Sequence, residues 1–187
     1  MSRSSCWGLA GCREVRGAVA ESRAGGSSRA TVNVMLMDKS FSELTTTELY
    51  AILQLRVDVF VVEQACAYPE LDGRDTEPET RHLWLPAGDG AVDDVGVASY
   101  LRVLQEGEGV RIGRVVTHPA LRGTGLGRVL VQAAIDAHSR MRIDIDAQSH
   151  LAGWYGTFGF RVMGEEFLDA GIPHLPMAHM PATSMAP

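Results

Sequence analysis

The stretch "RIGRVVTHPALRGTGLGRVL", residues 111–130, decides the fold that we predict for this chain. Its first part is an apolar run with isoleucine and two valines, which is typical of a strand. Its last part places Leu126, Val129 and Leu130 on one face of a helix. Three glycines at alternate positions lie between the two parts. The sequence therefore predicts a strand, a glycine-rich turn and a helix in direct succession.

The turn has the chemistry of an anion site. A strand that leads through such a turn into a helix gathers free backbone N–H groups at the positive end of the helix dipole. Glycine lets a phosphate approach this backbone, and Arg122 and Arg128 would add charged contacts. The spacing of Gly123, Gly125 and Gly127 does not match G-x-G-x-x-G, and no lysine follows as in a P-loop. The dinucleotide and P-loop interpretations are therefore excluded.

The spacing of Arg122, Gly125 and Gly127 in the pattern R-x-x-G-x-G resembles the acetyl-CoA pyrophosphate loop of the GNAT superfamily of N-acetyltransferases. In that family the preceding strand is splayed from its neighbour, and its free backbone groups bind the pantetheine arm. A turn of this kind can also be a tight strand-to-helix connection and nothing more. The interpretation therefore depends on its context in the rest of the chain.

A second block supplies that context. "QSHLAGWYGTFGF", residues 148–160, is similar to the second cofactor element of the family, with Gln148 where asparagine is usual and Tyr155 at the position of the tyrosine. Four separated blocks, from "LYAILQLRVDVFVVEQ" to "GIPHLPM", narrow the resemblance to the ElaA-like subfamily. The resemblance covers roughly residues 36–180.

The resemblance implies an acetyl-CoA site. Backbone groups of Val115, Val116 and Thr117 would bind the pantetheine arm. The other expected cofactor residues are Arg122, Gly123, Thr124, Gly125, Leu126, Gly127, Arg128, Gln148 and Tyr155.

Acetyl transfer to an amine needs a neutral nucleophile, a donor for the oxyanion and a proton for the departing thiolate. Tyr155 is the expected general acid, although a core aromatic with a satisfied hydroxyl is the alternative. The backbone N–H of Val116 is the expected oxyanion donor. Histidines among the base candidates can equally be structural. The base is left open among Glu63, Asp72, Asp75, His82 and His174.

Acidic residues crowd the segment 63–79, which its prolines and glycine mark as a long loop. Their charge would attract a cationic acceptor such as a primary amine, and a solvated surface loop is the alternative. The residues expected on the acceptor side are Arg56, Glu63, Gln64, Asp72, Asp75 and His82.

Charge is unevenly distributed along the 187 residues, whose net charge is −6. Residues 1–30 carry five arginines and two glutamates, and the rest carries 12 basic and 21 acidic groups, which does not favour a nucleic-acid partner. Residues 1–30 are poor in large apolar side chains and are expected to be a disordered extension of a single domain, 31–187. No apolar run is long enough to span a membrane. The scattered Cys6, Cys12 and Cys66 match no disulfide framework or metal site, so a cytoplasmic protein without metal is expected.

The remaining pattern predicts a mixed α/β fold. A capping box at Thr45 and Glu48 begins an amphipathic helix. Strands are expected near 82–86, 94–104, 110–117 and 141–148, with a short helix stopped at Gly159 and two strands after it. The resemblance implies a mostly antiparallel central sheet with a splayed parallel pair and flanking helices.

The leading hypothesis is an acetyl-CoA-dependent N-acetyltransferase that acts on an amine of a small molecule or a protein by direct attack in a ternary complex. A CoA-binding regulatory or sensor module without catalysis is the alternative. An acyl-CoA-dependent lactone-forming synthase is a third hypothesis, since "LRVDVFVVEQ" resembles those enzymes faintly. A homodimer is left open.

Overall fold

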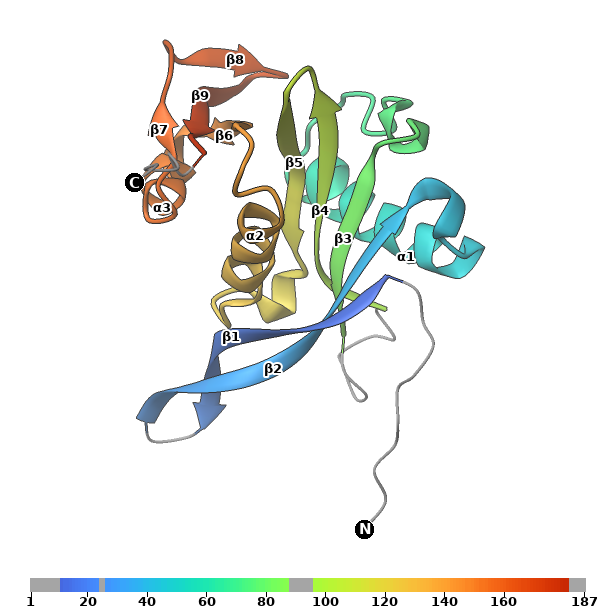
Figure 1. Ribbon diagram of the computed structural model, residues 1–187, viewed down its shortest axis with the longest axis vertical. Helices are drawn as coiled ribbons and strands as arrows, with labels where there is room; N and C mark the ends of the chain where they lie inside the picture. Colours follow the sequence, from blue (N-terminus) through green and yellow to red (C-terminus); the bar gives the residue numbers. More distant parts are fainter. Residues whose placement is uncertain (1–10, 24–25, 88–95, 182–187) are drawn as a thin grey trace, which may run out of the picture.

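One nine-stranded sheet runs through the part of the chain that the structure, a computed structural model, describes: residues 11–23, 26–87 and 96–181 (Figure 1). The strand order is β1-β2-β3-β4-β5-β6-β9-β7, and β8 pairs with β9. The strands are β1 (Cys12–Arg23), β2 (Gly26–Ser40), β3 (Arg81–Pro86), β4 (Val97–Glu106), β5 (Gly109–Thr117), β6 (Ile143–Gln148), β7 (Arg161–Val162), β8 (Phe167–Asp169) and β9 (Ile172–His179). The predicted mixed α/β class is confirmed.

Helices cover both faces of the sheet. They are α1 (Thr46–Arg56), which continues as a π-helical segment (Val57–Glu63), α2 (Leu126–Ala137) and α3 (Ala152–Gly156). Among the described residues no helix is long and apolar enough to cross a membrane. The predicted helices at α1, α2 and α3 are all present.

Two hydrophobic cores lie on opposite faces of β4. Tyr100 and Leu101 are consecutive, so their side chains point to opposite sides of the sheet. Leu101 packs in one core with the buried Leu130 of α2, and Tyr100 packs in the other with the buried Ile52 of α1. The sheet is therefore the middle layer between α1 and α2 (Figure 1).

The helix α1 begins where the capping box predicts. Thr45 Oγ1 accepts a hydrogen bond from Glu48 N at 3.2 Å, and Glu48 Oε2 accepts one from Thr45 N at 2.8 Å. These reciprocal bonds satisfy backbone donors that the first helical turn leaves free. They fix the start of the segment that ends at Glu63, on the edge of the site described below.

Strands β5 and β6 pair only briefly and then separate. Their parallel register holds Val110 opposite Ile143 and Arg111 opposite Asp144, and no later pair follows. On its other side β5 contains a bulge against β4, where Arg114 takes a φ of 55°. A bulge bends its strand and increases the local twist. The splayed parallel pair implied by the resemblance is thus present.

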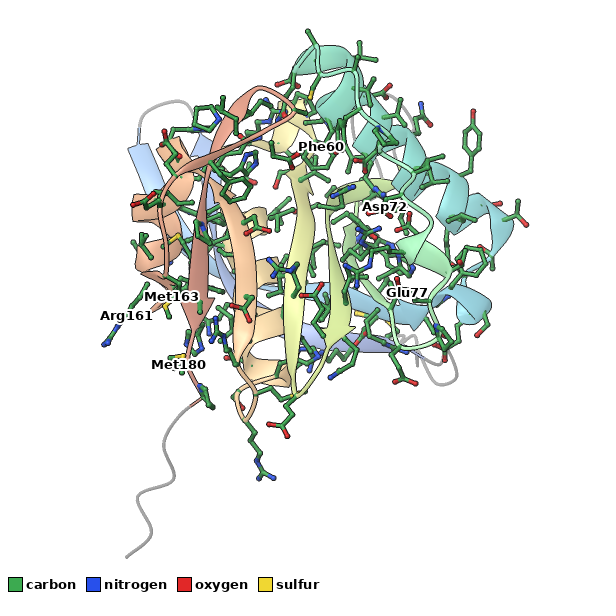
Figure 2. The ribbon with its side chains drawn as sticks, turned by 90° about the horizontal axis from the view of Figure 1, so that it is seen from above. Phe60, Asp72, Glu77, Arg161, Met163 and Met180 are labelled. Carbon is green, nitrogen blue, oxygen red and sulfur yellow. The ribbon has the colours of Figure 1, made fainter. Side chains whose placement is uncertain are left out.

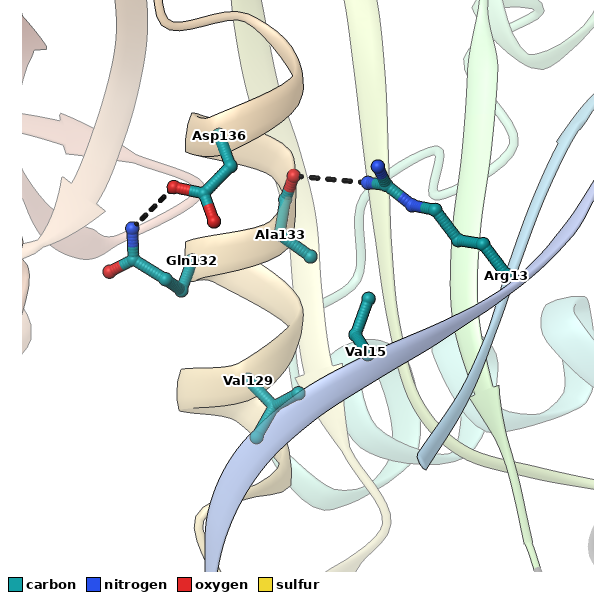
Figure 3. Close-up of a pocket in the computed structure, with 6 residues that line it drawn as sticks. All are labelled: Arg13, Val15, Val129, Gln132, Ala133 and Asp136. Carbon is teal, nitrogen blue, oxygen red and sulfur yellow. Dashed lines mark hydrogen bonds between the residues drawn. The ribbon is translucent and has the colours of Figure 1, made fainter. Parts of the chain in front are cut away.

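The N-terminal part corrects one prediction. Part of the range expected to be disordered forms β1, which pairs antiparallel with β2 from Cys12–Met37 to Arg23–Gly26. The hydrogen bonds of such a ribbon use backbone groups, which composition does not reveal. Arg13 of β1 also donates to the carbonyl of Ala133 on α2 at 3.3 Å (Figure 3). Residues 1–10 of the predicted extension lie outside the described residues.

The C-terminal strands differ in detail from the expectation. Residues 160–169, expected as one strand, form two short strands instead, β7 and β8. Both pair with β9. Ala170 and Gly171 have φ values of 48° and 84°, so β8 and β9 are joined by a two-residue turn.

Candidate active site

A cavity of about 1190 Å³ opens where β5 and β6 separate. Its walls come from β5, the glycine turn, the end of β6, α3, the loop after the π-helical segment and the β8–β9 hairpin. Figure 2 shows two of its residues, Phe60 and Asp72, on the same side of the molecule, while Arg161, Met163 and Met180 lie at the other edge of the sheet.

The glycine turn forms one end of this cavity. Gly123 and Gly125 have φ values of 78° and 97°, a region that residues with a Cβ rarely adopt. The first hydrogen bond inside α2 runs from Val129 N to Gly125 O, so the N–H groups of the first helical turn remain without an intrahelical partner. A Cβ on Gly127 would lie 3.1 Å from Thr117 Oγ1. Glycine at this position therefore lets the start of α2 lie close to β5. The backbone N–H groups of the first turn of α2 are left without intrahelical partners at this end of the cavity.

The two arginines of the turn have different partners. Arg122 binds the Glu63 carboxylate through two hydrogen bonds: Nη1 donates to Oε1 at 2.7 Å, and Nη2 donates to Oε2 at 2.8 Å. Hydrogen bonds to this guanidinium lower the pKa of Glu63. Arg128 donates to Thr157 Oγ1 at 2.9 Å and lies 4.6 Å from the centre of the Phe158 ring. Arg122 thus already holds a carboxylate in the geometry that suits a phosphate.

Backbone groups of β5 point alternately toward β4 and toward the cavity. His118 N–H donates to a β4 carbonyl at 2.9 Å, and Ser99 Oγ of β4 donates to Val116 O at 2.9 Å. Bonds to the same neighbour recur at every second residue of an antiparallel ladder. The backbone of Val116 is therefore directed at β4, whereas Val115 and Thr117 direct theirs away from it. This corrects the expectation that the Val116 N–H faces an oxyanion.

Tyr155 lies on α3 and borders the cavity with 6 % of its surface exposed. Its ring is edge-on to Trp154 and Phe160, with centroids 4.8 Å and 5.8 Å away. Burial raises the pKa of the phenol, and no hydrogen bond with a described residue opposes that shift. The hydroxyl is therefore held protonated beside the cavity.

Most of the expected cofactor residues line the cavity. Gln148 does so at the end of β6, where its Nε2 donates to Gln64 Oε1 at 3.2 Å. Thr124 is the exception and does not line the cavity. Its hydroxyl donates to Leu121 O at 2.6 Å. The others at the cavity are Val115, Val116, Thr117, Arg122, Gly123, Gly125, Leu126, Gly127, Arg128 and Tyr155.

Arg56, expected on the acceptor side, is fully buried instead. Its Nε lies 2.6 Å from Glu70 Oε1, and its Nη1 lies 2.7 Å from Asp75 Oδ1. Burial opposes the charge of Asp75, but hydrogen bonds to Arg56 outweigh it and lower the pKa of the carboxyl. A buried charge of this kind is tolerated because it is paired and hydrogen-bonded.

A second layer of ion pairs reaches the cavity wall. Arg102 holds both oxygens of Asp72, at 2.8 Å and 2.6 Å. Arg114 lies 3.2 Å from Asp72 and 2.8 Å from Glu70 Oε2. Burial of Asp72 is outweighed by its bonds to Arg102, so its pKa falls well below the usual range. Three arginines thus face the three carboxylates of Glu70, Asp72 and Asp75.

His82, another expected acceptor residue, has both ring nitrogens occupied. Nδ1 lies 2.8 Å from the Tyr100 hydroxyl, and Nε2 lies 3.0 Å from Asp75 O. Burial lowers the pKa of the ring, which is fully enclosed.

The expected acceptor and base residues divide into two groups. Glu63, Gln64, Asp72 and His174 line the cavity, whereas Arg56, Asp75 and His82 do not. Three of the loop carboxylates, Glu70, Asp72 and Asp75, are paired with arginine and do not present the free negative charge that the sequence suggested.

Tyr68, Arg114 and Asp169 are among the wall residues that sequence reasoning did not single out. Tyr68 lies on the loop, and the centre of its ring is 5.5 Å from Cζ of Arg114. Asp169 lies at the end of β8. The positive φ of Arg114 has no signal in the sequence. The Ala-Gly pair after Asp169 is a recognisable hairpin turn and could have placed that residue.

Known proteins share the fold and much of the sequence. The profile of the acetyltransferase (GNAT) domain family matches residues 63–180. A UPF0039 protein of Mycobacterium tuberculosis is 49 % identical over 139 residues, which span 72 % of this chain and 86 % of that protein. Protein ElaA of Escherichia coli is 40 % identical over 148 residues, 75 % of this chain and 93 % of ElaA.

Two crystal structures are similar along nearly their whole length. An acyl-CoA N-acyltransferase from Pseudomonas aeruginosa is 40 % identical with a TM-score of 0.69, and the match covers 77 % of this chain and 97 % of that one. The structure of Escherichia coli ElaA has the same TM-score at 35 % identity, and the match covers 78 % of this chain and 99 % of ElaA.

Proposed function

This chain belongs to the GNAT acetyltransferase family, with relatives named ElaA, and from that premise we propose that it transfers an acetyl group from acetyl-CoA to a primary amine in a ternary complex. One observation carries the proposal. The anion-binding turn and a protonated tyrosine border the same cavity, in the gap between β5 and β6. An acyl-CoA needs this combination, because its phosphates and its reacting thioester are at opposite ends of a long chain.

The pyrophosphate would bind at the turn. The free N–H groups at the start of α2 and the helix dipole favour an anion there. Arg122 would exchange the carboxylate of Glu63 for a phosphate, since the two groups need the same pair of donors. The pantetheine arm would follow β5, where Val115 and Thr117 offer backbone groups directed away from β4.

The reacting centre would lie between β5 and α3. A backbone N–H aimed at the developing oxyanion stabilises the tetrahedral intermediate, and we assign this role to Val115, whose backbone groups are directed away from β4. Tyr155 would give its proton to the departing thiolate, because burial keeps the phenol protonated at neutral pH. Arg56, Asp75 and His82 would hold the wall of the site and touch no substrate.

The acceptor would be an amine of a small molecule or a protein in the cytoplasm, without nucleic acid. Its recognition would not depend on a free acidic loop, since Glu70, Asp72 and Asp75 are each paired with arginine. A homodimer stays a prediction.

The test is acetyl transfer by the full chain with acetyl-CoA and a panel of primary amines, followed by thiol release and by the mass of the product. We expect thiol release that depends on the amine, and a product heavier by one acetyl group. Micromolar binding of CoA in calorimetry without release for any amine would support the sensor hypothesis instead.

A further inference from the structure

The β8–β9 hairpin presents one face to the cavity. Asp169, Ile172 and His174 all line it, and the register places Asp169 opposite Ile172 and Phe167 opposite His174. Side chains at alternate positions of a strand share a face, as do those of paired residues. The tip of the hairpin meets the loop across the cavity, where Cys66 Sγ lies 3.6 Å from the carbonyl of the residue after Asp169. This face closes the end of the cavity opposite the glycine turn.

The ring of His174 is oriented by two contacts. Its Nδ1 lies 2.8 Å from the carbonyl oxygen of Ile172, and the ring stacks on Phe167 with centroids 5.9 Å apart at 29°. A carbonyl oxygen only accepts, so Nδ1 must carry the hydrogen. In the neutral ring the lone pair is then on Nε2. No described residue makes a hydrogen bond with Nε2, so His174 has an available acceptor atom and lines the cavity.

Three other carboxylates that line the cavity are bound by arginine. Glu63 is held by both Nη atoms of Arg122, and Asp72 by both Nη atoms of Arg102. Asp146 lies 2.8 Å from an arginine of β5. The pKa of Glu63 and that of Asp72 are lowered, and a carboxylate stabilised in this way is a weak base.

Asp169 is different from these three. No ion pair joins it to another of the residues that the structure describes, and it is solvent-exposed on the same hairpin face as His174. Elements packed against β9 bring further titratable groups to the cavity. These groups are Asp146 on β6, His150 in the turn after β6 and Asp169 on β8. Asp169 thus offers a negative charge that a cation can neutralise.

We propose that this hairpin face is the amine site: Asp169 binds the ammonium form of the acceptor, and Nε2 of His174 accepts its proton. The proposal rests on the proposed acetyl transfer and specifies its acceptor as a primary amine that arrives charged. The neutral nitrogen then adds to the acetyl carbon to give the tetrahedral intermediate, and the carbon–sulfur bond breaks as this intermediate collapses. The thiolate takes the Tyr155 proton, and the phenol regains one from the nitrogen. One ammonium and acetyl-CoA give the amide, CoA thiol and one proton, which His174 passes to water.

The experiment compares pH profiles of kcat and kcat/KM for the full chain, His174→Gln and the matched control His138→Gln, using acetyl-CoA and the fastest amine of the panel. His138 also bonds a backbone carbonyl through Nδ1, at 2.9 Å, but lies at the end of α2 outside the cavity. We expect His174→Gln to lower kcat about 100-fold, the scale of lost base catalysis. The decrease of kcat/KM toward acidic pH should also disappear in this variant. Imidazole added to His174→Gly should restore part of the rate.

Asp169→Asn should raise KM for the amine about fivefold and leave kcat near that of the wild type, because it removes attraction and not proton transfer. Affinity for CoA, measured by calorimetry, should be unchanged in every variant and reports correct folding. A His174→Gln enzyme with the wild-type profile overturns the assignment of the base, and an unchanged KM overturns that of Asp169. A wild type that acetylates no amine overturns the proposed function together with this site.

Discussion

Tyr155 packs in an aromatic group and also lines the cavity. Its ring completes an aromatic group with Trp154 and Phe160, which explains why the sequence alone allowed a core interpretation. Its hydroxyl borders the cavity and is kept protonated by burial. A phenol that has no hydrogen-bond partner in the described protein is free to serve a ligand.

Tyr155→Phe is expected to lower kcat by about 10- to 100-fold while the affinity for CoA stays within about twofold, because only the proton donor is lost. The free energy of unfolding should stay the same, since the ring packing is retained. Steady-state kinetics, calorimetry and urea unfolding measure the three quantities. Tyr50→Phe, at a position 71 % exposed on α1, is the matched control. Equal turnover in both variants would remove Tyr155 from the mechanism.

The unit formed by β5, the turn and α2 is the element at which we propose that acetyl-CoA binds. Its sequence was sufficient to predict each part, because β-branched residues, glycines and a helical apolar stripe are local signals. The bulge at Arg114 and the short pairing of β5 with β6 were not readable in this way. Both arise from how β5 is held between two neighbours, one of which is distant in the sequence.

Gly123→Ala should destabilise this unit by about 1–2 kcal/mol, the cost of a side chain in left-handed backbone. An added Cβ would have free space there, so the φ of 78° is the whole cause. Gly153→Ala in α3 is the control, with equal space and no positive φ, and should be neutral or stabilising. Urea unfolding measures both. Equal stability of the two variants would contradict the role of the turn geometry.

At the scale of the whole molecule, buried ion pairs connect α1, the loop, β4 and β5. Arg56 and Arg102 both reach Asp75, and Arg102 also holds Asp72. Removing one partner would leave a buried charge without compensation, which costs far more than an exposed pair contributes. The network therefore makes this part of the loop a component of the folded core.

The stability of the fold should fall in two stages as the pH decreases. Burial lowers the pKa of His82, so its contribution is complete above the unfolded value of about 6.5 and is lost as the pH falls through the folded value. The pKa values of Asp72 and Asp75 are also lowered, and their contribution is lost below the unfolded value of about 3.9. Urea unfolding between about pH 3 and 8 measures both stages.

His82→Gln is the informative variant for this prediction. It should remove the stage that begins near neutral pH and leave the decline below about pH 4, which belongs to the carboxylates. A wild type with constant stability from about pH 8 down to 5 would contradict the assignment to His82.

The sequence by itself determined the mixed α/β class, the three helices, most of the strands and the glycine turn. These depend on capping, turn chemistry and hydrophobic period, which act over a few residues. The family followed from the same local blocks, and the matching relatives confirm it.

Tertiary structure alone decided the partners of the charged residues and the acceptor side. Arg56, Asp75 and His82 have the composition of a binding site but lie inside, because residues up to 27 positions apart in the chain meet and neutralise one another. The β1–β2 ribbon formed because backbone hydrogen bonds need no particular side chains. The position of His174 at the cavity is likewise a matter of long-range packing, and no pattern in the sequence encodes it.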